Sequence, residues 1–305
     1  MKESSSEPIA QPLTPISVSL ALLTSALWGG NAVATRFALD GMPPLAAAGV
    51  RFTLATAFML VWCCVERTRL KLRSNQWLPV VVMGILLFLQ IGTFNLGLQS
   101  SNASHAVLLV NTSIFWVLLI EQWFFRTHKL TGKKIVGVAL AFCGMALVIL
   151  TGSETDSAVS DSPSLEGDAI LAVSSLILGI KIVYTRQAVR QVEPGALIFW
   201  HDVIGTILLF LASVCFESPE WKALTVTMVL ALLYQGLLVG GFCFGMNAVL
   251  LKKHLASQIA VFAFAAPLFG VVLAQLLRDD PLTPWLPVAT VCVTGGIVLA
   301  NWRDV

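Results

Sequence analysis

The sequence has few charged residues, and this scarcity excludes most soluble folds. Asp, Glu, Lys and Arg together make up 12% of the chain, whereas hydrophobic residues make up 57% and the mean hydropathy is +0.83. Soluble domains carry about 25% charged residues. The net charge is only +2 and the basic residues form no binding face, so we expect no nucleic-acid partner. The composition instead predicts a protein embedded in a lipid bilayer.

Cysteine is also scarce, and the common catalytic motifs are missing. All six cysteines fall inside apolar stretches, without Cys-x-x-Cys spacing or a neighbouring pair of histidines. Neither a disulfide framework nor a zinc site is therefore expected. The chain lacks Gly-x-Ser-x-Gly, His-Glu-x-x-His and P-loop motifs, and its connections are too short for a soluble catalytic domain. We expect no enzyme and no cofactor, and keep an integral-membrane enzyme as the weaker alternative.

What the sequence does contain is a series of apolar stretches of about 20 residues, the length of a helix that crosses the hydrocarbon core. Ten such stretches cover residues 16–39, 44–66, 77–98, 103–125, 134–151, 168–189, 195–216, 224–250, 256–277 and 283–302. The polar residues 1–15 before them are rich in Ser and Pro and indicate a disordered tail. The predicted fold class is an all-α integral membrane protein with ten transmembrane helices.

Positive charge alternates along the connections. Of the 19 Lys and Arg residues, 14 lie at the termini or in every second connection, and Lys222 and Arg278 lie in the others. Cytoplasmic connections retain Lys and Arg, so both termini, including the tail 1–15, are predicted to be cytoplasmic. The expected location is the plasma membrane, the inner membrane of a bacterium.

The chain divides into two similar halves, residues 16–151 and 168–302. The acidic segment 152–167 between them contains no Lys or Arg and is predicted to be an extracytoplasmic linker. An offset of 150 carries Thr35 and Pro44 onto Thr185 and Pro194, and an offset of 152 carries Gly84 onto Gly236. Because each half holds five helices, the second half would cross the membrane in the opposite direction, as an inverted repeat.

Three segments resemble the EamA-type transporters of the drug/metabolite transporter superfamily: the run ALWGGNAVATRFAL at 26–39, the residues 131–149, and AAPLFG at 265–270. The resemblance implies a carrier, usually an exporter, of a metabolite or drug. Two positions depart from the family pattern, since Ser113 replaces a common proline and Arg126 replaces a common acid. The matching positions in the second half, Pro267 and Asp280, keep it.

Ionisable side chains at membrane depth are costly, and they are therefore the first candidates for a site. Lys181 is the deepest cation, and Asp202 is its expected acidic partner. His201 occupies the repeat position of Arg51, so the two are candidates for mirror-related faces of one binding site. His201 and Asp202 are also candidates for proton coupling. The alternative for all four is a structural ion pair or a helix-to-helix hydrogen bond.

Uncharged polar and aromatic residues complete the predicted substrate site. Buried amides need hydrogen-bond partners, which a substrate or a neighbouring helix can supply. Internal tryptophans can stack on a substrate or simply pack. The candidates are Trp28, Asn31, Gln90, Asn111, Trp116 and Gln235.

Together these features predict a secondary transporter of a small metabolite, amino acid-like compound or drug, working outward by alternating access. Its expected partners are the small-molecule substrate, the lipid bilayer and, as a coupling ion, protons. Assembly as a homodimer is left open. The alternative transporter is a nucleotide-sugar or sugar-phosphate antiporter, which would need several cations for the phosphate, whereas the sequence offers Arg51 and Lys181.

Overall fold

The protein was analysed as a computed structural model, which describes residues 13–120, 163–218, 222–254, 265–280 and 284–301, with isolated positions between 123 and 147 and at 259 and 262. The predicted tail up to residue 12, most of the fifth apolar stretch, and the linker up to residue 162 lie outside the described residues.

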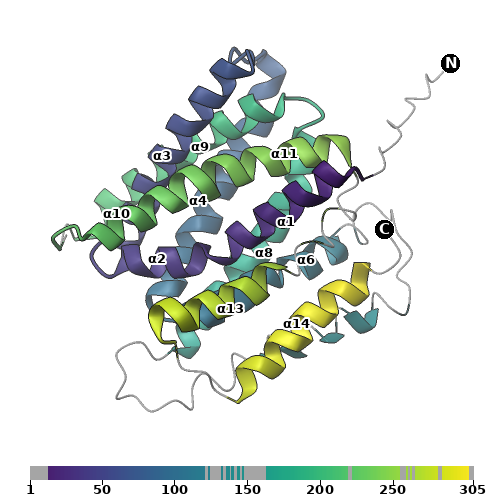
Figure 1. Ribbon diagram of the computed structural model, residues 1–305. Coiled ribbons are helices and arrows are strands. Elements are labelled where there is room, and N and C mark those ends of the chain that lie inside the picture. Colours follow the sequence, from purple (N-terminus) through teal and green to yellow (C-terminus); the bar gives the residue numbers. More distant parts are fainter. Residues whose placement is uncertain are drawn as a thin grey trace.

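The described part of the chain is helical and contains no strand (Figure 1). Seven helical segments are long and apolar enough to cross a membrane. Four of them lie in the first half: Pro15–Leu39 (α1, Pro15–Gly29, and α2, Asn31–Leu39), Pro44–Val65 (α3), Ser74–Gln99 (the 3₁₀ turn Ser74–Gln76 and α4, Trp77–Gln99) and Ala103–Ile120 (α5, Ala103–Asn111, and α6, Ser113–Ile120). Three lie in the second half: Leu165–Ala188 (α8), Pro194–Phe216 (α9) and Val226–Lys253. The last of these consists of α10 (Val226–Leu233), η3 (Tyr234–Cys243) and α11 (Phe244–Lys253). Two shorter apolar helices follow, α13 (Ala265–Arg278) and α14 (Trp285–Asn301).

Local sequence signals set the starts of these helices. Thr14, Asn102, Ser164 and Thr225 each accept a backbone N–H in the first turn of the helix that follows. The helices α3 and α9 each begin at a proline, where the missing N–H costs no hydrogen bond. Caps and prolines therefore place the helix starts within a few residues of the ends predicted from hydropathy.

Three of the stretches predicted as single spans are interrupted. The first is divided at Gly30, where an added Cβ would lie 2.6 Å from the Tyr234 hydroxyl. The fourth is divided at Thr112, without a proline, and the Thr112 hydroxyl bonds back to the Leu109 carbonyl at 2.6 Å. The eighth contains the π-helical turns of η3. Such breaks are common near functional sites.

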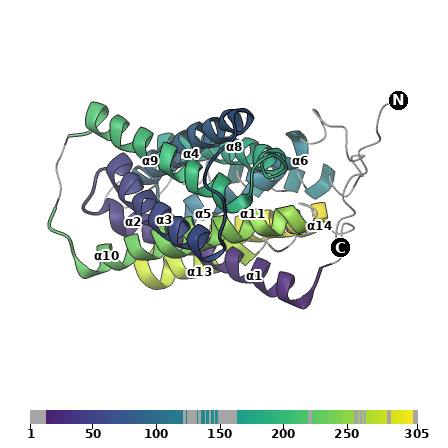
Figure 2. The same ribbon diagram turned by 90° about the horizontal axis from the view of Figure 1, so that it is seen from above.

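The helices pack as a bundle in which the two halves of the sequence interdigitate (Figures 1 and 2). Helix α3 packs against α9 and against η3, and α4 packs against α8 and α9. Helix α1 lies against α13, and α6 lies against α8. Each of these contacts joins a helix of residues 13–120 to one of residues 163–280, so the polar residues of the two halves meet at the centre.

Candidate functional site

Five buried polar residues from four helical elements form the Arg51 cluster, and all were site candidates from the sequence. Arg51 belongs to α3, Lys181 to α8, His201 and Asp202 to α9, and Gln235 to η3. Their exposed fractions are 5% or less. Each lies about two turns or more from the nearest end of its span. The charges of Arg51, Lys181 and Asp202 interact with one another.

Much of this cluster lacks hydrogen-bond partners among the described residues. The unpartnered atoms are Nε and Nη1 of Arg51, Nζ of Lys181, Nε2 of His201, both carboxylate oxygens of Asp202 and Nε2 of Gln235. Buried polar atoms in proteins are nearly always hydrogen-bonded, because an unsatisfied one costs about 1–3 kcal/mol and a charged one more. A concentration of such atoms at one place is typical of a site that binds polar groups.

His201 and Asp202 lie close together without sharing a proton. The Nδ1 atom of His201 is 2.9 Å from the Ile198 carbonyl oxygen and 3.1 Å from Oδ1 of Asp202. The contact with the carbonyl has hydrogen-bond geometry, whereas the contact with Oδ1 has the distance of an ion pair without that geometry. The contact with Asp202 is therefore electrostatic, and both carboxylate oxygens stay available.

The predicted ion pair between Lys181 and Asp202 is replaced by a different arrangement. No hydrogen bond or ion pair joins their side chains in the described part of the chain. The Nζ atom of Lys181 instead lies 4.6 Å from the centroid of the Phe244 ring. A cation over an aromatic face is attracted to the ring quadrupole, which offsets part of its desolvation.

Phe244 is the aromatic centre of the site, and the sequence reasoning missed it. Its ring centroid lies 6.0 Å from that of His201, 6.2 Å from that of Phe52 and 5.9 Å from that of Trp28. A phenylalanine inside an apolar span carries no sequence signal of its own. Its position directly after the π-helical turns of η3 is the feature that distinguishes it.

Two further candidates reach the cluster, Asn31 through Thr35 and Gln235, and Trp28 through Phe244. The Thr35 hydroxyl lies 3.0 Å from Oε1 of Gln235 and 2.8 Å from the Asn31 carbonyl oxygen. The Asn31 side chain adds an unpartnered buried Oδ1. Trp28, one turn earlier, contacts Phe244. The break at Gly30 thus falls where the first apolar segment passes the cluster.

The remaining three candidates make contacts between or within helices. Gln90 pairs with Ser174, whose hydroxyl donates to the Gln90 carbonyl at 2.8 Å and accepts from the Gln90 amide at 3.4 Å. The Asn111 amide donates to the Val107 carbonyl one turn back, at 2.7 Å. Trp116 packs against Gly179, where an added Cβ would come within 2.6 Å of it. Helix packing accounts for these contacts.

The fold and this site define a helical membrane protein with a buried, charged and aromatic centre, and comparison with known proteins agrees. The model of the EamA-like transporter family matches the chain twice, over residues 15–150 and 165–302. A probable amino-acid metabolite efflux pump of Escherichia coli (strain K12) is 24% identical over 93% of this chain and 95% of its own length. An uncharacterized transporter of Archaeoglobus fulgidus is 25% identical over 93% of this chain and 97% of its own.

A solved structure has the same fold, with a TM-score of 0.69 and 17% identity over 92% of this chain and 96% of that chain. The chain therefore belongs to the EamA-like transporter family, and the resemblance seen in its sequence is confirmed. It is a multi-pass membrane protein whose relatives include transporters and efflux pumps.

Proposed function

We propose that this protein is a secondary active transporter that moves a small metabolite outward by alternating access. The observation that carries the proposal is the Arg51 cluster, since its charged atoms without hydrogen-bond partners lie inside the apolar spans, about two turns or more from their nearest ends. Ionisable groups at that depth mark substrate or ion pathways in membrane proteins. The interrupted segments near Gly30 and at η3 are features that transporters place beside their substrate sites.

Matched glycine contacts support the arrangement of the helices as two inverted repeats, each of which is predicted to contain five helices. A Cβ added to Gly84 would lie 2.5 Å from the side chain of Ile204, and one added to Gly236 would lie 2.5 Å from that of Leu54. Gly84 and Gly236 are equivalent in the sequence repeat, and so are Leu54 and Ile204. A matching close approach in each half is what a pseudo-two-fold axis would produce, and it supports the inverted repeat.

The predicted orientation has support from one end of the bundle. Ser164, at the end of the linker, donates its backbone N–H to the Ser100 carbonyl at 2.9 Å and its hydroxyl to the same oxygen at 2.7 Å. The linker and the connection before α5 therefore share one end. Both lack Lys and Arg, which agrees with an extracytoplasmic end and cytoplasmic termini in a plasma membrane. Proton coupling and homodimer assembly stay predictions.

The charges of the cluster favour a substrate that carries both a carboxylate and an amine. Arg51 and Lys181 supply cations, and Gln235 adds an amide donor to them. Asp202 supplies two free acceptor oxygens for a substrate ammonium group. A phosphate dianion would meet the same cations but would also be repelled by the buried Asp202 carboxylate, which makes the sugar-phosphate alternative weaker.

Counterflow in proteoliposomes tests this function. Vesicles loaded with unlabelled amino acids should accumulate the matching labelled compound, and Lys181→Met should abolish accumulation, whereas Lys222→Met at the exposed Lys222 should leave it unchanged. Accumulation of labelled nucleotide sugars or sugar phosphates alone would support the antiporter. Parent-like counterflow by Lys181→Met would remove the Arg51 cluster from the substrate site.

A further inference from the structure

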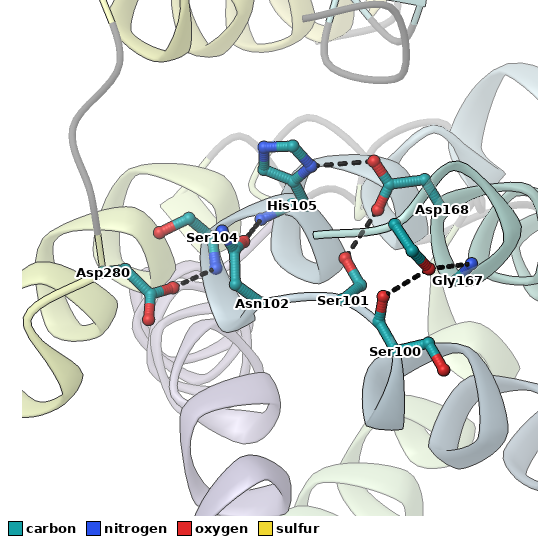
Figure 3. A network of polar contacts seen from close by, with 9 residues as sticks. Ser100, Ser101, Asn102, Ser104, His105, Gly167, Asp168 and Asp280 are labelled. Carbon is teal, nitrogen blue, oxygen red and sulfur yellow. Dashed lines mark hydrogen bonds and ion pairs between the residues drawn. The ribbon is translucent and has the colours of Figure 1, made fainter. Parts of the chain in front are cut away.

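A second buried polar group, the Asp168 network, lies at the end of the bundle where the linker meets the connection before α5 (Figure 3). It consists of Ser101, His105 and Asp168. The Ser101 hydroxyl donates to Oδ1 of Asp168 at 2.5 Å, and Nδ1 of His105 lies 2.8 Å from Oδ2. Asp168 is fully buried and His105 is 4% exposed. Both carboxylate oxygens of Asp168 have hydrogen-bond partners, whereas those of Asp202 in the Arg51 cluster have none among the described residues.

These bonds fasten one short helix, α5, to the second half of the chain. His105 and Thr112 are seven residues apart, as are their partners Asp168 and Ser175 on α8, and the Thr112 and Ser175 hydroxyls lie 2.8 Å apart. The matched spacing shows that α5 and α8 run in parallel and are tied at both ends of α5. Asp280, which follows α13, adds a third tie by accepting the Ser104 backbone N–H at 2.9 Å (Figure 3).

Of these ties, one contains an imidazole, the side chain that ordinarily changes charge between about pH 5 and 8. When Nδ1 carries the proton of neutral His105, it donates to the Asp168 carboxylate and leaves the Nε2 lone pair free. Figure 3 shows Nε2 on the side of the ring away from Asp168. A proton that binds Nε2 forms an imidazolium, and the hydrogen bond to Asp168 becomes an ion pair as well, which is shorter and stronger.

We propose that His105 is a proton-binding site that controls how firmly α5 is attached to α8. Protonation tightens the attachment at this end, and loss of the proton loosens it, while the Ser101, Thr112 and Asp280 ties stay the same. The site is separate from the Arg51 cluster, and the proposal does not depend on transport. That the proton comes from the extracytoplasmic side rests on the orientation proposed above.

The other ionisable groups of the described elements packed against α5 leave His105 and Asp168 as the pair in direct contact. Helix α8 contributes the exposed Glu166 in its first turn. Helix α2 contributes Arg36, which donates to the Leu98 and Gln99 carbonyls. Arg278 at the end of α13 pairs with Asp40 at 2.5 Å, and Asp279 and Asp280 follow it. The helix α4 contains no ionisable side chain.

Backbone hydrogen exchange of the full-length protein in nanodiscs tests the proposal at pH 5.5 and pH 8. After correction for intrinsic exchange, α5 should exchange roughly fivefold faster at pH 8, because loss of the imidazolium charge removes the Coulomb attraction that it adds to the hydrogen bond with the Asp168 carboxylate. His105→Gln should exchange equally at both pH values. His254→Gln is the matched control, since buried His254 directly follows α11 and joins Ser17 of α1 through Nε2 at 2.8 Å. In the His254→Gln variant, the exchange rate of α5 should keep the pH dependence of the parent.

The outcomes separate the alternatives. Equal corrected exchange of α5 at both pH values in the parent overturns the proposal, and so does a pH dependence that survives in His105→Gln. Loss of the dependence in His254→Gln also overturns it, because the effect would then be global. If His105→Gln does not purify in a folded form, Asp168→Asn removes the other partner of the pair and must abolish the dependence. Counterflow by the parent at either pH tests the proposed function, not this site.

Discussion

The Arg51 cluster and the Asp168 network are both buried, both polar and both built from the two halves of the chain, yet they differ in how many of their polar atoms have hydrogen-bond partners. In the Asp168 network each carboxylate oxygen accepts a hydrogen bond. In the Arg51 cluster both oxygens of Asp202 and the ammonium group of Lys181 have no hydrogen-bond partner among the described residues. The two carboxylates are equally buried, with exposed fractions of 0%. The two carboxylates therefore differ in their hydrogen-bond partners and not in their burial.

This difference indicates how the protein divides its polar groups between folding and function. A buried charge with partners holds helices in register, whereas a buried charge without partners destabilises the fold until a ligand supplies them. The comparison predicts opposite results for substitutions in the two groups. Charge removal should affect transport more than stability in the Arg51 cluster, and stability more than transport in the Asp168 network.

The largest effect is expected from Lys181→Met. The substitution removes a buried ammonium group that has no hydrogen-bond partner among the described residues, and it keeps most of the apolar volume and the contact surface toward Phe244, so the folded protein should be at least as stable as the parent. Transport should fall by at least about a hundredfold, because a charge-assisted contact with the substrate is lost. Counterflow and the thermal unfolding midpoint measure the two quantities. A stability loss as large as that of Asp168→Asn would show that Lys181 has a structural partner.

The next effect is expected from Asp168→Asn. Asparagine keeps the shape of the side chain but loses the charge that His105 and Ser101 contact, and this should lower the free energy of unfolding by about 2–3 kcal/mol. Reversible denaturant unfolding in detergent measures it, with the exposed Glu166→Gln as a control on the same helix. A change no larger than that of the control would place the Asp168 network among contacts that add nothing to stability.

A smaller loss, about 1 kcal/mol, is expected from Glu217→Gln. The two carboxylate oxygens of Glu217 accept the backbone N–H groups of Leu45 and Ala46, at 2.6 and 3.0 Å, and so cap α3 from the end of α9. Glutamine offers one acceptor oxygen and no charge to the helix dipole. The exposed Glu66→Gln, at the other end of α3, is the matched control. Equal unfolding midpoints for the two variants would contradict the capping role.

The smallest effect is expected from Ser175→Ala, about 0.5–1 kcal/mol, because it removes one neutral hydrogen bond to Thr112. The pH dependence of α5 exchange should survive this substitution, since the imidazole is untouched. Differential scanning fluorimetry and hydrogen exchange measure the two expectations. Loss of the pH dependence would mean that the Thr112 tie, and not His105, governs the attachment of α5.

Hydropathy predicted most of the fold because a span needs about 20 apolar residues whatever its detailed conformation. The described residues of the predicted stretches are almost all helical, and the helix ends that the structure describes are shifted by a few residues at most positions. The break at Thr112 and the π-helical turns of η3 were not predictable from composition. They depend on which neighbouring helix supplies a contact, such as the Ser175 hydroxyl beside Thr112.

The candidate site was partly predictable for a related reason. Arg51, Lys181 and Asp202 stand out because a charge in an apolar span is rare, and the structure brings them together. Phe244 has no such contrast with its surroundings. His105 lies near a predicted helix end, where a polar residue is ordinary, so nothing in its sequence position pairs it with Asp168. Three-dimensional proximity, not residue type, identifies both.

The capping of α3 by Glu217 has a consequence for biosynthesis. The acceptor of the Leu45 N–H is 172 positions further along the chain. At a synthesis rate of about 5–20 residues per second, the start of α3 waits about 9–34 seconds for its cap. The tie between His105 and Asp168 spans only 63 positions and forms earlier. The start of α3 is therefore synthesised well before its capping residue, and its first N–H groups are capped only after Glu217, at the end of α9, has been made.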